Sequence, residues 1–340
     1  LRKAGEIYLN AERVIACWGM GITQHKHSVA TIHMITNLLL LRGHLGRPGA
    51  GVCPVRGHSN VQGDRTMGIF EQMPAWFHDH LDAEFGFTSP REHGWDTVAA
   101  IEAMAAGKAK VFLGMGGNFA RATPDSHVTE AALRSLDLTV QVSTKLNRSH
   151  VVHGRRALIL PTLGRTEADV QAGGPQRVTV EDSMSMVHAS GGLLTPPAPT
   201  VRAEVWILCA LGLELFRAGS ALAERAPRVD WAALAKDYSL IREHIAEVVP
   251  GFENFNERLR APGGFTLPHP PRDRREFQTP SGRAELVVSP LQYPDLPPGR
   301  LLLQTLRSHD QYNTTIYGTD DRYRGIHDGR RVVFVHPKDA

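Results

Sequence analysis

The residue types that could do chemistry are concentrated between Val14 and Gly68. A short apolar strand, expected over residues 14–17, ends in a turn with two glycines, and a second, glycine-rich loop covers residues 43–63. Glycines let backbone N–H groups approach an anion closely, so strand, glycine turn and helix together are typical of a phosphate-binding crevice. Arg56 adds a fixed positive charge among small and amide residues of the second loop. The pattern indicates a site for a large polar cofactor with a cation near its reactive end.

The first glycine turn, Gly19-Met20-Gly21, is weak evidence by itself, because glycines follow strands in many α/β proteins. Its context strengthens it. Thr23, Gln24 and His25 are expected at the start of the next helix, where backbone donors and the helix dipole would face an anion. Turn and second loop together therefore predict a ligand site.

Composition restricts the class of protein. The chain has 340 residues with 42% hydrophobic and 21% charged, values of an ordinary globular enzyme with room for two or three domains. The net charge of +3 is small and scattered, which argues against nucleic acid as a partner. No segment approaches the ~18 to 20 apolar residues of a membrane span.

The three cysteines show no paired spacing for zinc, an iron–sulfur cluster or a disulfide framework. This favours a reducing compartment, and we expect a cytoplasmic protein. Cys17 and Cys53 are interpreted as buried small hydrophobes. The close histidine pairs lack a third ligand, so we predict no metal-ligating residue in this chain.

The predicted fold class is α/β: parts of two parallel-sheet (Rossmann-like) domains and the start of a C-terminal β-barrel-like domain. Strands alternating with helices imply a parallel sheet with ligand sites at the carboxyl ends of its strands. Helices are expected at 28–41, 97–106, 124–136, 201–213 and 230–248, and strands at 110–113, 138–142, 157–160 and 331–335, with a short strand pair near 283–288.

Four segments are predicted. They are the C-terminal part of an α/β cofactor-binding domain (1–60), a second α/β domain with a dinucleotide crevice (61–165), a connector with helices (166–300) and the truncated start of the barrel-like domain (301–340). The chain begins without Met, inside a charged helix-like run, and stops just after a predicted strand. We therefore expect both ends to be cut from a longer protein.

Five long motifs carry a family resemblance: GMGITQH, LRGHLGRPGAGVCPVRGHSNVQG, MGGNFARATPD, TVQVSTKLNRSHVVHGRRALILPTLGRTEAD and TLRSHDQYNTTIYGTDDRYRGI. Together they resemble the molybdopterin oxidoreductases, the DMSO-reductase-like enzymes. The most similar branch is that of formate-dehydrogenase alpha-subunit-like proteins, in particular an oxidoreductase subgroup linked to acid resistance. The motifs span most of the chain.

The resemblance implies a bis-molybdopterin guanine dinucleotide centre with Mo or W and two-electron oxidation or reduction of a small, formate-like substrate. It also implies a [4Fe-4S] cluster and a metal-ligating residue upstream of Leu1, and a redox electron-carrier protein as partner. The cofactor would carry out the redox chemistry, and the protein would orient the substrate and provide the electrostatic environment.

The resemblance also assigns roles to residues. Arg56 would lie beside the metal and hold a small carboxylate through two hydrogen bonds, with His58 as the second catalytic candidate. Met20 and Gln24 would contact the pterin or nucleotide phosphates, and Asn118 and Gln141 the second dinucleotide. The other cofactor-binding candidates in these motifs are Trp18, Gly19, Gly21, Thr23, Gly57, Asn60, Gly116, Thr123 and Thr144.

Two positions depart from the family pattern. Formate dehydrogenases carry Gln where this chain has His58, beside the catalytic arginine. A guanine-contacting Asp is replaced by Ala157, which is flanked by Arg155 and Arg156. Both departures argue against strict formate specificity.

Other interpretations remain open. The chain could belong to a structural or electron-relay subunit that kept the fold and lost the metal site. A nicotinamide-dependent dehydrogenase is disfavoured. Such enzymes have an acidic residue ~20 positions after the glycine turn that binds the dinucleotide, and neither glycine turn of this chain is followed by one. The polar run Lys145–His150 either lines the cofactor funnel or is a solvated loop.

Overall fold

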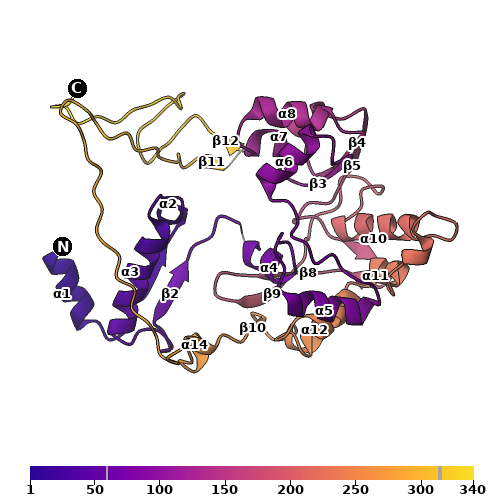
Figure 1. Cartoon of the computed structure of the whole chain (residues 1–340), viewed down its shortest axis with the longest axis horizontal. Helices are drawn as coiled ribbons and strands as arrows, with labels where there is room; N and C mark the ends of the chain where they lie inside the picture. The colour runs from indigo at the N-terminus through magenta and orange to yellow at the C-terminus, as the bar shows by residue number, and fades with distance from the viewer. Residues whose placement is uncertain (59, 313–315) are drawn as a thin grey trace. The chain divides into compact units, whose positions relative to one another are not determined.

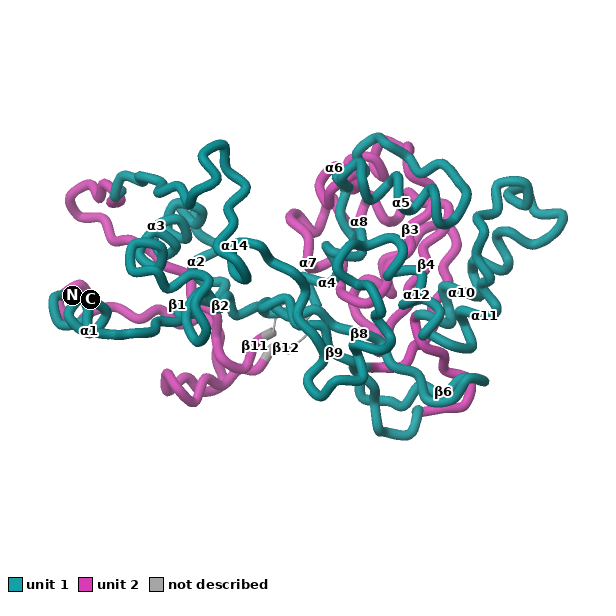
Figure 2. Tube along the Cα trace, turned by 90° about the horizontal axis from the view of Figure 1, so that it is seen from below, with its two compact units in different colours: residues 1–94, 165–196, 205–292 teal, residues 95–164, 197–204, 293–340 magenta. Residues whose placement is uncertain are grey.

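The computed structural model describes residues 1–58, 60–312 and 316–340. The chain divides into two compact units, each assembled from segments that are distant in sequence. Unit 1 comprises residues 1–94, 165–196 and 205–292, and unit 2 comprises residues 95–164, 197–204 and 293–340 (Figure 2). The architecture is mixed α/β with parallel sheets, which confirms that part of the predicted fold class.

Unit 1 begins with a small α/β element. In chain order it consists of α1 (Arg2–Asn10), β1 (Ile15–Trp18), α2 (Met20–Thr23), α3 (Ser28–Leu41) and β2 (Gly51–Pro54) (Figure 1). The two strands pair in parallel, and α3 covers the residues predicted for it. The side chain of Asn37 on α3 fastens a later segment, because it donates to the carbonyl of Val287 at 2.7 Å and accepts from its N–H at 3.3 Å.

The remainder of unit 1 contains helices and antiparallel strands. They are α4 (Val61–Thr66), α5 (Ala75–Phe85), β6 (Val170–Gln171), β7 (Gly174–Pro175), β8 (Val178–Glu181), β9 (Met186–Ser190), α10 (Glu204–Leu215), the 3-10 helix η1 (Ala223–Arg225), α11 (Trp231–Lys236), α12 (Ser239–Val248), α13 (Phe255–Arg258), β10 (Phe265–Thr266) and α14 (Pro270–Asp273). Strands β8, β9 and β10 form one sheet, and β6 pairs with β7.

Two features of this region were not predicted. The connector contains the hairpin of β8 and β9, whose turn is closed by Asp182 accepting from the N–H groups of Met184 (2.8 Å) and Met186 (3.0 Å). The helix predicted over 230–248 is two helices. Asp237 between them is extended and accepts from the N–H of Ser239 at 2.9 Å, which begins α12 as a new helix.

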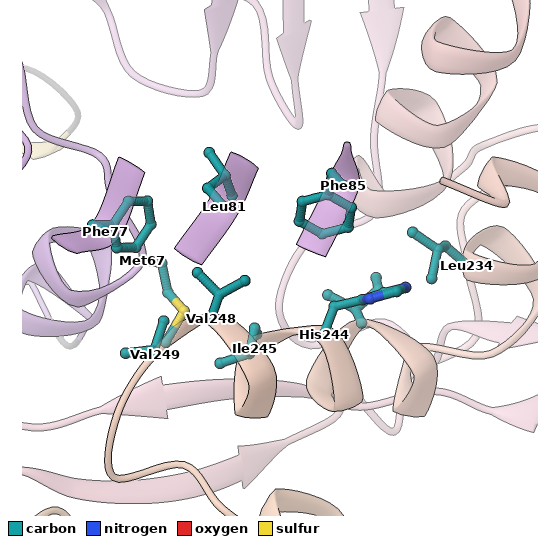
Figure 3. A pocket seen from close by; sticks show the side chains of 10 residues that line it. Met67, Phe77, Leu81, Phe85, Leu234, His244, Ile245, Val248 and Val249 are labelled. Carbon is teal, nitrogen blue, oxygen red and sulfur yellow. The ribbon is translucent and has the colours of Figure 1, made fainter. Parts of the chain in front are cut away.

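The core of this part of unit 1 is aromatic and aliphatic. Phe252, Phe255 and Phe265 pack on one another and on Val187, and α5 packs against α12. A pocket of about 150 Å³ lies between these two helices (Figure 3). Its walls are apolar apart from His244, whose Nδ1 lies 2.5 Å from Oε1 of Glu84.

Unit 2 holds a parallel sheet in the order β3-β4-β5. Its elements are α6 (Thr97–Ala105), β3 (Val111–Met115), α7 (Phe119–Ala122), α8 (Ser126–Arg134), β4 (Leu138–Ser143), α9 (Arg148–Val151) and β5 (Arg156–Pro161) (Figure 1). Helices α6 and α8 bury Ile101, Met104 and Leu133 in one cluster. The predicted strands and helices of unit 2 are confirmed to within two residues at most of their ends. Helix α6, for example, begins after Asp96, whose side chain caps it.

The C-terminal part of unit 2 contains β11 (Gln311–Tyr312) and β12 (Ile316–Tyr317) as a short antiparallel pair. The strands predicted at 331–335 and near 283–288 are absent from the described residues, and no closed barrel is formed there. An apolar run becomes a strand only when a neighbour completes its backbone hydrogen bonds, and these runs have no such neighbour in the described chain. In the described residues, no helix combines the length and apolar character required to cross a bilayer.

Candidate functional site

A pocket of about 370 Å³ lies in unit 1 at the carboxyl ends of β1 and β2. The register pairs Trp18 with Pro54, so the two strands end side by side. The N–H of Val55 donates to the carbonyl of Trp18 at 2.7 Å and carries the pairing one residue further. The pocket is lined by Trp18, Gly19, Met20, Thr23, Ile32, Pro54, Val55, Arg56, Gly57, His58 and Val61. Seven of the sequence-predicted residues thus share one cavity.

The glycines in and next to the pocket serve two different purposes. A Cβ on Gly19 or Gly21 would meet nothing within 4 Å, and neither residue has a positive φ. These positions leave open space beside the backbone, which is what close approach of a bulky ligand requires. A Cβ on Gly57, in contrast, would lie 2.9 Å from the sulfur of Met20. Gly57 therefore lets the Arg56 loop pack against the first glycine turn.

The prediction that Thr23, Gln24 and His25 lie at the start of a helix was wrong. Gly19 is the N-cap of α2, so this short helix begins directly after the strand. Thr23 is its last residue and donates from its hydroxyl to the carbonyl of Met20 at 3.2 Å, while Gln24 is its C-cap. His25 lies between α2 and α3. Of the polar residues in this run, the pocket contains Thr23 in its wall but neither Gln24 nor His25.

Arg56 is exposed at the pocket, and its Nη2 donates to Oε1 of Gln62 at 3.3 Å. Among the described residues no carboxylate lies within ion-pair distance of its guanidinium. An arginine of this kind can receive an anion without first breaking an internal ion pair. His58 lines the same pocket.

Asn60 is used by the protein itself. Its Oδ1 accepts from the N–H of Glu181 at 2.9 Å, and its Nδ2 donates to Oδ1 of Asp64 at 3.3 Å. Thr66 donates to Oε2 of Glu181 at 2.6 Å. Burial raises the pKa of Glu181, the Thr66 hydrogen bond lowers it in part, and the charge of Asp182 raises it again. Asn60 thus holds the end of the Arg56 loop rather than pointing its amide into the pocket.

The other five candidates lie in unit 2, around the ends of β3 and β4. Gly116 has a φ of +69° in the turn after β3, and Asn118 is the N-cap of α7. The hydroxyl of Thr123 donates to the carbonyl of Phe119 at 3.0 Å, and Thr144 is exposed after β4. Gln141 is buried on β4, directly opposite Gly114 of β3.

Two buried nitrogens in unit 2 have no hydrogen-bond partner within the described chain: Nε2 of Gln141 and Nε2 of His150. A buried donor without a partner costs about 1–3 kcal/mol, so such atoms in one unit call for an explanation. A polar ligand bound near the ends of β3 and β4 is an explanation that fits both atoms, because it could accept a hydrogen bond from each nitrogen. Within unit 2, these two atoms are therefore compatible with a polar ligand.

His150 belongs to the run that the sequence left undecided. It is buried, and its Nδ1 accepts from the N–H of Asn147 at 2.9 Å while the Asn147 side chain accepts from the N–H of Ser149 at 2.9 Å. Ser149 in turn donates to Oδ1 of Asn118 at 3.3 Å. The signal for this arrangement was present in the sequence, because Asn followed three residues later by a polar side chain resembles a capping box.

Cys17 is exposed and Cys53 is half-buried, so the interpretation of both as buried hydrophobes was wrong for Cys17. The two residues lie opposite one another on β1 and β2. In the part of the chain that the structure describes, no three His, Cys, Asp or Glu side chains are grouped so as to hold a metal ion.

Comparison with known proteins finds similarity to one family over the segment that carries these sites. Residues 4–168 match the model of the molybdopterin oxidoreductases. The oxidoreductase Rv2900c of Mycobacterium tuberculosis is 62% identical over 339 residues, and the protein YdeP of Escherichia coli is 47% identical over 343 residues. Both alignments cover all of this chain, which spans 43% and 44% of the length of these relatives.

YrhE of Bacillus subtilis, provisionally named as a formate dehydrogenase, is 32% identical over 155 residues, which cover 42% of this chain and 16% of that protein. The matched family segment includes both the pocket of unit 1 and the strand ends of unit 2. Residues 4–168 are therefore similar to the molybdopterin oxidoreductases, and the similarity to the two longer relatives extends over the whole of this chain.

Proposed function

We propose that this chain is part of a formate-dehydrogenase-like molybdenum oxidoreductase with a bis-molybdopterin guanine dinucleotide centre. The observation that carries the proposal is the pocket at the ends of β1 and β2, where Arg56 has no ion-pair partner among the described residues and shares the wall with Gly19 and Gly57. When bound, the cofactor supplies the transfer of two electrons to or from a small substrate.

The residues of unit 1 would hold one part of the cofactor and the substrate. Gly19 and Gly21 leave the backbone of the β1–α2 turn accessible, and Met20 and Thr23 form the wall behind it. Arg56 would bind a carboxylate through two N–H groups and fix its orientation, while Gln62 keeps the guanidinium in place. His58 would lie beside the bound anion and donate or accept one hydrogen bond.

The residues of unit 2 would hold the second dinucleotide. Gln141 and His150 each have a buried nitrogen ready to hydrogen-bond a polar ligand, and the turn at Gly116 leaves open space next to it. Asn118 is positioned by Ser149. The side chains of Thr123 and Asn60 form hydrogen bonds within the protein. We therefore assign them a structural role next to the site and not a direct contact with the cofactor.

The test is purification of the full-length protein that contains this chain, followed by metal analysis and by pterin fluorescence after mild oxidation. We expect Mo or W together with the pterin, and reduction of an artificial electron acceptor when formate or another small carboxylate is supplied. A well-folded protein without metal and pterin would overturn the proposal and favour a structural or electron-relay subunit. Metal and pterin without turnover of any small carboxylate would restrict it to the cofactor and reject the substrate class.

A further inference from the structure

The structure brings two thiols together next to the pocket. Cys17 and Cys53 are register partners in the parallel pair of β1 and β2. Partners in neighbouring strands project from the same face of the sheet, with the strands ~4.8 Å apart. A disulfide bond requires Cα atoms roughly 4.4–6.8 Å apart. The register therefore provides the separation between the two Cα atoms that a disulfide needs.

The two thiols differ in accessibility. Cys17 is exposed, whereas Cys53 is half-buried. Burial raises the pKa of Cys53, and the neighbouring thiol of Cys17 and the charge of Asp182 raise it further. Because the thiolate is the reacting form, an external oxidant should react first at Cys17. Cys53 is then placed to attack the modified sulfur. The third cysteine, Cys209, is buried in α10 and provides an internal control.

We propose that Cys17 and Cys53 form a reversible intramolecular disulfide on reaction with a small disulfide such as glutathione disulfide. The Cys17 thiolate attacks one sulfur of glutathione disulfide, forms a mixed disulfide and releases one glutathione thiolate. Cys53 then loses its proton and attacks the Cys17 sulfur, which breaks the mixed disulfide and releases the second glutathione. The two protein thiols lose two electrons, glutathione disulfide gains them, and the two thiol protons pass through solvent to the glutathione thiolates.

The bond would act on the pocket because of its position. Cys17 and Cys53 each directly precede a residue of the pocket wall, Trp18 and Pro54 respectively. A covalent link between the strands at this level would fix the separation of the two chain segments that leave the sheet to form the cavity. This modification does not rest on the proposed activity, since it needs only the register of β1 and β2.

The test uses the full chain, incubated with glutathione disulfide and then alkylated and digested with trypsin. We expect peptide 14–26, which contains Cys17, and peptide 43–56, which contains Cys53, to be recovered as one species linked by a disulfide. Treatment with dithiothreitol should separate them. Peptide 203–217, which contains Cys209, should remain unmodified until the chain is unfolded.

Two variants test the order of events, and C209S is their matched control. In C53S the reaction should stop at glutathione on Cys17, and in C17S it should be several-fold slower. C209S should form the same linked peptide as the unmodified chain. Recovery of glutathione on both cysteines, linkage only between two chains, or no reaction of the folded unmodified chain would each overturn the proposal. That last measurement requires no variant to fold.

Discussion

The side-chain oxygen of Asn60 accepts a hydrogen bond of 2.9 Å from the backbone N–H of Glu181, which follows 121 positions later in the chain. Thr66 donates to the carboxylate of the same Glu181 at 2.6 Å, so α4 is joined to the end of β8 at two points. The loop that carries Arg56 and His58 continues into α4. The position of this loop therefore depends on a strand that is remote in sequence.

Substitution Glu181→Gln should change how stability depends on pH. Glu181 is only 5% exposed, and burial raises its pKa above that of the unfolded chain. A carboxyl of this kind stabilises the fold when protonated, and this contribution is lost as the pH rises through the folded-state pKa. Gln keeps the acceptor for Thr66 and does not ionise. The free energy of unfolding of the variant relative to the unmodified chain should thus increase as the pH rises above the unfolded-state pKa of Glu, about 4.3.

Urea unfolding at several pH values measures this difference. Glu6→Gln on the exposed face of α1 is the matched control and should give a curve parallel to that of the unmodified chain. A Glu181→Gln curve that is also parallel would show that the carboxyl does not titrate differently on folding.

Substitution Gln141→Leu should separate stability from cofactor retention. It removes a buried Nε2 that has no partner in the described chain, so the cofactor-free chain should become more stable by about 1 kcal/mol. If this amide binds the second dinucleotide, the same variant should retain less pterin when purified as holoenzyme. Thermal unfolding and pterin content are the two measurements.

Thr139→Val on the same strand is the control. Its hydroxyl accepts from the N–H of Gly154 at 3.3 Å and is buried, so this variant should lose about 1 kcal/mol of stability. A loss of stability in Gln141→Leu as large as that in Thr139→Val would mean that the amide is satisfied in the folded chain.

Substitution Asn147→Ala should destabilise unit 2 by about 1–2 kcal/mol. The Asn147 side chain accepts from the N–H of Ser149 at 2.9 Å and donates to the carbonyl of Gly117 at 2.7 Å. Both bonds are lost in the variant, and the start of α9 loses its cap. Chemical denaturation measures the effect, with exposed Thr144→Ala expected to change stability by less than about 0.5 kcal/mol. Equal effects at both positions would contradict the capping role.

Substitution Arg56→Lys tests the proposed substrate role. Lysine keeps the charge but loses the paired N–H groups, so kcat/KM for a small carboxylate should fall by roughly 10- to 100-fold while metal and pterin content stay near normal. Arg47→Lys in the exposed glycine loop, outside the pocket wall, should leave both unchanged. If activity and cofactor content fell together in Arg56→Lys, Arg56 would serve assembly and not the substrate.

Local sequence patterns determined the elements that carry the candidate residues. Helix α3 and the strands of unit 2 lie close to where the patterns predict them, because apolar periodicity, Asp96 as N-cap and Gly107 with a φ of +69° act over a few residues. Because the carboxyl ends of parallel strands lie at one edge of a sheet, the expected strands also predict that the glycine turn and the loop with Arg56 lie close together. The role of Arg56 as a catalytic residue stays a prediction.

The tertiary structure decided what depends on pairing between distant segments. The register of β1 and β2 placed Cys17 against Cys53, although their spacing in the sequence indicates no bond. The burial of His150 and the link from Asn60 to Glu181 likewise arise from packing of segments that no local pattern relates. The strands expected near the C-terminus were wrong for the same physical reason, since a strand is stable only when a partner, often remote in the chain, satisfies its backbone hydrogen bonds.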